Sequence, residues 1–269
     1  MGPSLGDIDV DAYAEAYRDS APYYPVEDEA IGSLSKAFRE GEYGKRDVEW
    51  IVRWYFRRRV EAIDHVERRA VESAVADADR RELRGRLWDA IDALDEADQA
   101  DEAEQADEAE QADEAEQADE ADQADEAEQA DEADQADEAE QADEADHADE
   151  TDAADEASEA DETEQSAVSD SPPHHRALDA LTRIPGVDVA VGSAFLWFLE
   201  PDRHFVLGDR EWQVVAALGD LEGPFPDAPT VDDYDRYLDA VRAVARDLDV
   251  DHWRLYQTIQ QVYAEEFDD

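Results

Sequence analysis

The sequence predicts an all-α domain that is interrupted by a long acidic insert. Both ends of the 269-residue chain carry apolar residues at the spacing of amphipathic helices. Between them, residues 100–165 are eleven consecutive hexapeptides of the type Ala-Asp-Glu-Ala-Glu-Gln. We therefore expect a helical part over residues 1–94, an insert over residues 95–173 and a second helical part over residues 174–269.

The insert is predicted to be disordered. Ala at every third position advances by about 300° per step around a helix, so the apolar stripe winds around the axis and forms no face. The hexapeptides contain no Val, Ile, Leu or aromatic residue, and residues 95–173 hold 37 of the 78 acidic residues and no Lys or Arg. Such a segment cannot bury enough apolar surface to offset chain entropy.

Three roles for the insert stay open. It is an expanded or transiently helical product of tandem duplication, a phosphate-mimicking arm that contacts the basic N-terminal helix of the same protein, or a protein-binding tail. The two flanks have about 95 residues each, and neither alone has a generous core. We expect them to form a single domain, because the entropy of closing a long loop grows only logarithmically with its length.

The charge balance indicates a protein adapted to high salt. Outside the insert, 41 acidic residues stand against 23 basic ones, and only two of the basic residues are lysines. Such a surface is typical of a salt-saturated cytoplasm, where the Debye length is about 3 Å or less. We therefore expect an extreme halophile as the source and a cytoplasmic location. No cysteine is present, which excludes disulfides and thiol nucleophiles, and no apolar run predicts a membrane span.

The N-terminal part is predicted to hold several helices. Helices are expected over Asp7–Arg18 and Ile31–Glu40, with a Pro-containing loop at Ala21–Glu29 between them. A third helix is expected to begin with Asp47 as its N-cap, and residues 71–94 are expected to form one further helix or a pair.

This part also carries 15 of the 23 basic residues. Arg53, Arg57 and Arg58 alternate with aromatic residues, which in so acidic a chain indicates a surface for nucleic-acid phosphates. The alternative is that these arginines pair with acidic residues along the helix faces, such as Glu49 and Glu72.

The C-terminal part contains a short turn between two predicted helices. The first is expected over His175–Arg183, and Pro185-Gly186 then imposes a tight turn. Residues 181–194, with the sequence Leu-x-x-Ile-Pro-Gly-Val-Asp followed by small residues, resemble a helix-hairpin-helix element. Residues 205–210, Phe-Val-Leu-Gly-Asp-Arg, follow at the distance found in helix-hairpin-helix DNA glycosylases.

This resemblance implies a helix-hairpin-helix DNA-glycosylase-like fold and DNA as the partner. In that superfamily, backbone N–H groups of the hairpin hold a DNA phosphate. The corresponding residues here are Pro185, Gly186, Val187, Asp188 and Val189. A downstream Asp assists departure of a flipped-out base, and Asp209 matches it in context. From the residues alone, Asp209 is equally an N-cap for a helix that starts at Arg210.

The sequence departs from the family pattern in three places. Asp188 stands where the second hairpin Gly is usual, and its carboxylate should repel a phosphate. Ala190 stands where lyase-type members have Lys, so no Schiff base can form by that route. No four-cysteine iron–sulfur loop is present. If the protein is an enzyme, the resemblance therefore implies a monofunctional DNA N-glycosylase. The alternatives are a non-catalytic DNA-binding relative and a protein-interaction module that has lost DNA contact.

Three further pairs of side chains could contact a ligand but have a simpler explanation: Trp197 and Trp212, Tyr23 and Tyr24, and His174 and His175. The tryptophans lie at helical spacing and are expected in the core. The tyrosines are expected to pack on a surface loop rather than line a base pocket. The histidines are expected in a solvated loop, and we expect neither a metal nor a cofactor.

Overall fold

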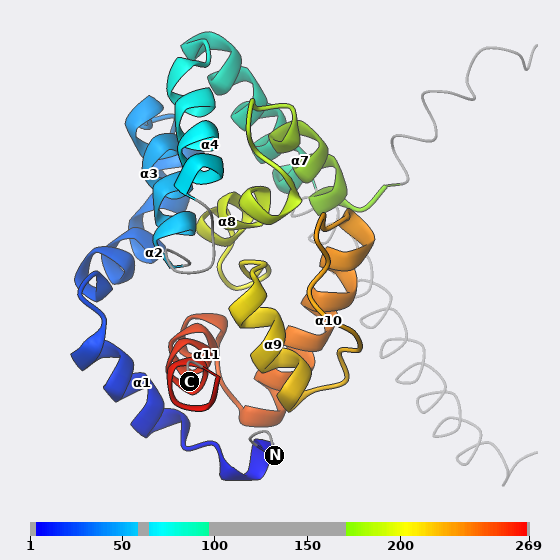
Figure 1. Cartoon of the computed structure of the whole chain (residues 1–269). Helices are drawn as coiled ribbons and strands as arrows, with labels where there is room; N and C mark the ends of the chain where they lie inside the picture. The colour runs from blue at the N-terminus through cyan, green and yellow to red at the C-terminus, as the bar shows by residue number, and fades with distance from the viewer. Residues whose placement is uncertain (1–3, 59–64, 97–170, 268–269) are drawn as a thin grey trace, which may run out of the picture. The chain divides into compact units, whose positions relative to one another are not determined.

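The computed structural model describes residues 4–58, 65–96 and 171–267 (Figure 1). All regular secondary structure in these ranges is helical, which confirms the all-α prediction. The labelled elements are, in chain order, η1 (Leu5–Asp7), α1 (Val10–Ser20), α2 (Tyr24–Arg39), α3 (Lys45–Arg57), α4 (His65–Asp77), α7 (Pro173–Thr182), α8 (Val189–Leu199), α9 (Asp209–Leu218), α10 (Val231–Leu248) and α11 (His252–Glu266). Residues 80–96 are also helical.

Both flanks of the repeat belong to one compact unit, formed by residues 1–96 and 172–269. Helix α1 lies against α11, so the first and last helices of the chain pack together (Figure 1). A second unit covers residues 97–171. The predicted disorder of the insert, and its predicted contact with the basic N-terminal helix, fall outside the described residues.

Helix α8 is the central element of the first unit (Figure 1). Every residue from Ala190 to Leu199 is buried, and α8 packs against α2, α3 and α7. Small residues allow this close packing: a Cβ on Gly192 would lie only 3.0 Å from a methyl carbon of Leu178 in α7. A helix that is apolar on all sides belongs in the core.

In the N-terminal part, two predictions of how helices begin are wrong. Pro25 lies in the first turn of α2, where its missing N–H is not needed, so residues 24–29 are helical rather than a loop. The N-cap of α3 is Gly44, not Asp47. Asp47 is the third helical residue, and its carboxylate accepts a hydrogen bond from the backbone N–H of Gly44 at 2.7 Å.

The two sides of the insert are tied together by arginines. The helix of residues 80–96 continues two residues past the predicted start of the insert. Asp95 pairs with Arg39, and Glu96 lies 2.5 Å from Nη1 of Arg176 in α7. The chain therefore leaves and re-enters the helical unit at neighbouring positions. Within the described ranges, no helix has the length and apolarity needed to cross a membrane.

Candidate functional site

Helices α7 and α8 enclose the predicted tight turn. Gly186 has a φ of +83°, which favours glycine, and Val187 donates a backbone hydrogen bond to the carbonyl of Ile184 at 3.0 Å. Asp188 is the N-cap of α8, and its carboxylate accepts a hydrogen bond from the backbone N–H of Val191 at 2.8 Å. The Asp188 side chain thus caps the following helix.

The surroundings of this turn oppose a phosphate. The Asp188 carboxylate already occupies the N-terminus of α8, where an anion would bind. A Cβ on Gly186 would lie 3.3 Å from Cα of Val71, so α4 packs against one side of the turn. A cavity of about 210 Å³ beside the turn is lined by two further carboxylates, those of Glu67 and Asp227.

The remaining predicted hairpin residues differ in accessibility. Pro185 and Gly186 are exposed, Val187 is buried and Val189 is half-buried. Backbone groups at the exposed positions are the part of the turn that another molecule can reach. Any phosphate at these groups would lie close to the Asp188 carboxylate, and repulsion between the two charges would weaken binding.

Asp209 is the first residue of α9, and Gly208 is its N-cap. The interpretation of Asp209 as an N-cap is therefore wrong. One oxygen of its half-buried carboxylate accepts a hydrogen bond from Nε2 of Gln213, one turn along the helix, at 2.9 Å. A different side chain of this segment faces a cavity, since Arg210 lines the pocket described below.

The three predicted phosphate-binding arginines have different environments. Arg53 is exposed and lies 3.1 Å from Glu49, so helix-face pairing accounts for it. Arg57 is exposed, and its guanidinium carbon lies 5.2 Å from the ring centre of Tyr23. Arg58 is buried and pairs with Glu211, so it is unavailable to an external phosphate.

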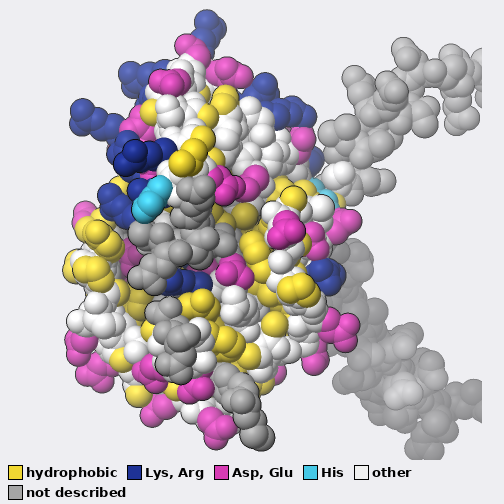
Figure 2. Space-filling model, viewed as in Figure 1, with side chains coloured by type: hydrophobic (Ala, Val, Ile, Leu, Met, Phe, Trp, Pro, Cys, Tyr) yellow, Lys and Arg dark blue, Asp and Glu magenta, His cyan; other side chains and the backbone are white. Residues whose placement is uncertain are grey.

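Other basic side chains gather at one end of the unit. Figure 2 shows Lys and Arg side chains over its upper part, where α3, α4 and residues 80–96 lie. Arg46, Arg69, Arg80 and Arg81 are exposed there. Arg68 in the same region lies 3.6 Å from Glu72, so part of this surface is neutralised by helix-face pairs, as the alternative interpretation expects.

A cavity of about 530 Å³ lies between the α1–α2 connection, α3 and α11. Its described lining residues are Tyr17, Ala21, Pro22, Tyr23, Val26, Glu27, Trp50, Trp54, Arg57, Arg58, Arg210, Tyr256 and Gln260. Five of these thirteen are aromatic and three are arginines. Tyr23 and Val26 are about half exposed and mark the open side of this aromatic pocket.

Glu27 supplies a buried carboxylate to the aromatic pocket. Tyr17 donates a hydrogen bond from its hydroxyl to Oε2 at 2.5 Å, and Trp54 donates from its indole nitrogen to Oε1 at 2.8 Å. Burial raises the pKa of Tyr17, and the neighbouring Tyr256 and Glu27 raise it further, so this hydroxyl remains a donor. A carboxylate accepts about four hydrogen bonds, so Glu27 can accept two more.

A second buried network closes one side of the pocket. Arg58 lies 2.5 Å from Oε1 of the fully buried Glu211, and Gln260 donates to the same oxygen at 2.6 Å. Burial acts to lower the pKa of Arg58, but Glu211 and two tyrosines outweigh it and the pKa is raised, so Arg58 stays charged. Its guanidinium carbon lies 4.3 Å from the ring centre of Trp54.

The network explains a glycine in the Gly208-Asp209-Arg210 segment. A Cβ on Gly208 would lie 2.1 Å from Oε2 of Glu211. Only glycine leaves room for this carboxylate, because Arg58 and Gln260 hold its other oxygen in place. Gly208 therefore leaves space for the carboxylate of Glu211.

The predicted surface position of Tyr23 is correct, and its ring also lines the aromatic pocket. The environment predicted for the histidines is wrong. His174 and His175 lie in the first turn of α7 rather than in a solvated loop, and both contact Asp235.

The third pair has the predicted environment. Trp197 and Trp212 are almost completely buried, which confirms their assignment to the core. The main residues of the aromatic pocket, Glu27, Trp54 and Tyr256, were not predicted as a site. They lie on three helices, of which α11 is distant in sequence from α2 and α3, and no motif links them.

Comparison with known proteins adds no family to these observations. No protein-family model, no curated protein and no solved structure matches this chain.

Proposed function

We propose that this protein binds nucleic acid by taking one unstacked base into the aromatic pocket. The observation that carries this proposal is the combination of aromatic walls with the buried Glu27 carboxylate in a cavity of about 530 Å³. Ligand pockets span roughly 300–1,000 Å³, so the space suits a base with part of its sugar.

The chemistry of the lining suits a base. Aromatic side chains stack on any base, and each stacked base contributes about 1–3 kcal/mol. The free lone pairs of Glu27 can accept from the amino or imino N–H groups on a base edge. Arg57 and Arg210 provide cations for the phosphates that accompany it.

The acidic, lysine-poor composition, which indicates a high-salt environment, favours base stacking in the pocket over phosphate contacts alone. Counterion release contributes little to affinity at multimolar salt, whereas stacking in a pocket does not depend on it. The basic end around Arg46, Arg80 and Arg81 can still position a strand. Helix α3 connects this end to the pocket, and about twelve residues of helix span about 18 Å.

The resemblance to helix-hairpin-helix DNA glycosylases remains part of the proposal. The succession of α7, a turn with Gly186 at positive φ, α8 and then Asp209 at the start of α9 supports a fold of that type. Asp209 is not among the described residues that line the pocket, and it is bonded to Gln213. We therefore propose base binding and assign no excision step to Asp209.

The test is binding of a single-stranded oligonucleotide that contains 2-aminopurine, a base whose fluorescence reports stacking, in about 2 M KCl. We expect quenching together with an increase in anisotropy. Tyr23→Ala should weaken binding about 5- to 100-fold, the cost of one lost stacking partner. Trp88→Ala is the matched control, because Trp88 is an exposed aromatic residue outside the pocket.

Glu27→Gln tests the contribution of the buried carboxylate to binding, because it removes the charge with little change in the shape of the pocket. The substitution should weaken the binding of probes whose base edge presents N–H donors. It should leave unchanged the binding of probes whose base edge presents only acceptors. Absence of binding to every single-stranded, duplex and mismatched probe, with circular dichroism showing a folded helical protein, would refute the proposal. That result would favour a protein-interaction module.

A further inference from the structure

A second cluster of ligand-type side chains lies away from the aromatic pocket. His174 and His175 follow Pro173 at the start of α7, and Asp235 lies one turn into α10. Nε2 of His174 lies 2.7 Å from one oxygen of Asp235, and Nε2 of His175 lies 2.6 Å from the other. The three groups offer ligand atoms that all lie within 4.8 Å of one another.

The arrangement is close to a metal-binding geometry. Zn²⁺ binds imidazole nitrogens at about 2.0–2.1 Å and carboxylate oxygens at about 2.0–2.2 Å, which sets ligand atoms about 3.3 Å apart in a tetrahedron. Nε2 of each histidine already lies within 2.7 Å of an oxygen of Asp235, so side chains at a partly open surface need only shift until the ligand atoms reach this spacing. Two imidazoles and one carboxylate are the protein ligands of many sites that keep a position open for water.

The site is half-buried, so an ion can enter and still be partly shielded from solvent. The side chains of His174, His175 and Asp235 are 20%, 26% and 34% exposed. An imidazole binds a metal through the lone pair of a ring nitrogen. Metal binding therefore requires each Nε2 to contact the ion instead of sharing a proton with Asp235.

A buried histidine lies directly behind the cluster. The ring centre of His204 is 5.8 Å from that of His174, and His204 is only 4% exposed. Its Nδ1 is buried and has no hydrogen-bond partner within the described residues. Buried polar atoms normally have a partner, so an unpaired imidazole nitrogen beside two others is a second, independent sign of a ligand.

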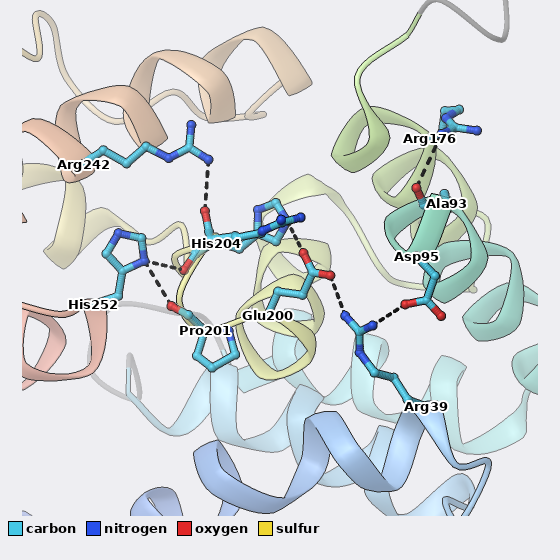
Figure 3. A network of polar contacts seen from close by, with 10 residues as sticks. Arg39, Ala93, Asp95, Arg176, Glu200, Pro201, His204, Arg242 and His252 are labelled. Carbon is cyan, nitrogen blue, oxygen red and sulfur yellow. Dashed lines mark hydrogen bonds and ion pairs between the residues drawn. The ribbon is translucent and has the colours of Figure 1, made fainter. Parts of the chain in front are cut away.

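His204 is itself held by a polar network, which Figure 3 shows. Its Nε2 lies 3.4 Å from Glu200, and Glu200 accepts from Nη2 of Arg39 at 2.6 Å. Metal sites are usually supported by such outer contacts, which fix the rings and exclude alternative positions.

We propose that His174, His175 and Asp235 bind one divalent transition-metal ion, with His204 beside it. Two imidazoles favour Zn²⁺, Co²⁺, Ni²⁺ or Fe²⁺ over Mg²⁺ and Ca²⁺, which prefer sites made of oxygen ligands alone. The ion links the start of α7, directly after the acidic repeat, to α10.

Co²⁺ is the probe for the experiment, because its visible absorption distinguishes nitrogen-containing sites of low coordination number from the hydrated ion. The full-length protein is titrated in about 2 M KCl with excess Mg²⁺, which occupies the carboxylates of the repeat. We expect one Co²⁺ per chain with intense visible bands, displacement of Co²⁺ by Zn²⁺, and a metal-dependent rise in the unfolding temperature.

Variants locate the site. His174→Ala, His175→Ala and Asp235→Asn should each weaken Co²⁺ binding more than about 10-fold. The matched controls are His65→Ala, an exposed histidine at the start of α4, and Asp232→Asn, an exposed carboxylate on α10. Both should bind Co²⁺ as the unchanged protein does.

Two results would overturn the proposal. One is a titration of the unchanged, folded protein that shows only the weak spectrum of hydrated Co²⁺. The other is equal Co²⁺ affinity in Asp235→Asn and Asp232→Asn, because Asn keeps the size of the side chain and removes the charge. Both readouts are independent of nucleic-acid binding, so the metal proposal can be refuted or supported independently of the proposal for the aromatic pocket.

Discussion

Replacing Arg58 by Met should strongly destabilise the helical unit. Arg58 and Glu211 are 153 residues apart in sequence, and their side chains are 5% and 0% exposed. Removal of the guanidinium leaves the Glu211 carboxylate buried, with the Gln260 amide still donating to it. Loss of one partner of a buried pair costs about 3–5 kcal/mol. Since domains are stable by about 5–15 kcal/mol, this is at least about a fifth of the total, and most of it for a domain of low stability.

The same reasoning predicts that a second substitution rescues the first. In Arg58→Met with Glu211→Gln, the uncompensated charge is gone and the neutral amide can still bond to Gln260. We expect this double variant to be more stable than Arg58→Met alone by about 2 kcal/mol. Arg53→Met is the surface control, because its pairing with Glu49 is exposed and should contribute less than about 1 kcal/mol.

Urea unfolding followed by circular dichroism in about 2 M KCl measures all four proteins, and the midpoints convert to free energies at a common slope. If the double variant is no more stable than Arg58→Met, the carboxylate of Glu211 is not an uncompensated charge in the single variant. That outcome would refute the buried-pair reasoning and with it the role assigned to Gly208.

Four further outcomes follow from the structure. Gly208→Ala should cost about 1–3 kcal/mol, because the new methyl group would meet the held carboxylate of Glu211; chemical unfolding measures this. Asp188→Ala should cost about 1 kcal/mol in the same assay through loss of the α8 cap. Burial lowers the pKa of His252 despite its two backbone carbonyl partners. The unfolded state then binds the proton more readily, so stability should fall as the pH drops below the ordinary histidine range, and His252→Asn should reduce this slope in unfolding measured against pH. Deletion of residues 100–165 should stabilise the unit by about 2 kcal/mol in thermal unfolding if the insert is unstructured, because the loop becomes about eightfold shorter.

Each of these outcomes can fail in a distinct way. An unchanged Gly208→Ala protein would mean that the carboxylate of Glu211 moves freely. A pH slope that His252→Asn leaves unaltered would assign the titration to other groups. Destabilisation on deletion of residues 100–165 would show that the repeat contributes structure to the unit. The same deletion, assayed with DNA, tests the phosphate-mimicking arm, which requires tighter binding once the repeat is gone.

The helices were predictable because periodicity reports burial along one element. In α3, Val48, Ile51 and Val52 recur at helical spacing, and all three are buried. Helix starts were less predictable. Pro25 is typical of a loop or of a first helical turn, and Asp47 is typical of an N-cap or of a first helical turn. Which of the two applies depends on where the first turn begins.

The aromatic pocket could not be predicted from periodicity. Glu27 is paired with Trp54 of the next helix, and Arg58 is paired with Glu211, which is 153 residues away in sequence. Charged residues are almost never fully buried unless they are paired, and the partner is visible only once the helices are packed. A pattern of charges along one helix therefore predicted a phosphate surface at Arg58, where packing instead places a buried ion pair.

The net charge of this protein limits which of its surfaces can bind nucleic acid. A chain with a formal net charge of −55 repels nucleic acid at low salt, and at high salt its exposed arginines are screened. At the turn between α7 and α8, a phosphate would have to bind through backbone dipoles, and Asp188 places a carboxylate at that position. Contacts keep their strength at high salt only where water and ions are excluded. The stacking surfaces and the buried carboxylate of the aromatic pocket provide such contacts. If nucleic acid binds this protein, its affinity should therefore depend on the aromatic pocket far more than on the turn. Tyr23→Ala should then reduce affinity more than any substitution at Pro185 or Gly186 that leaves the fold intact.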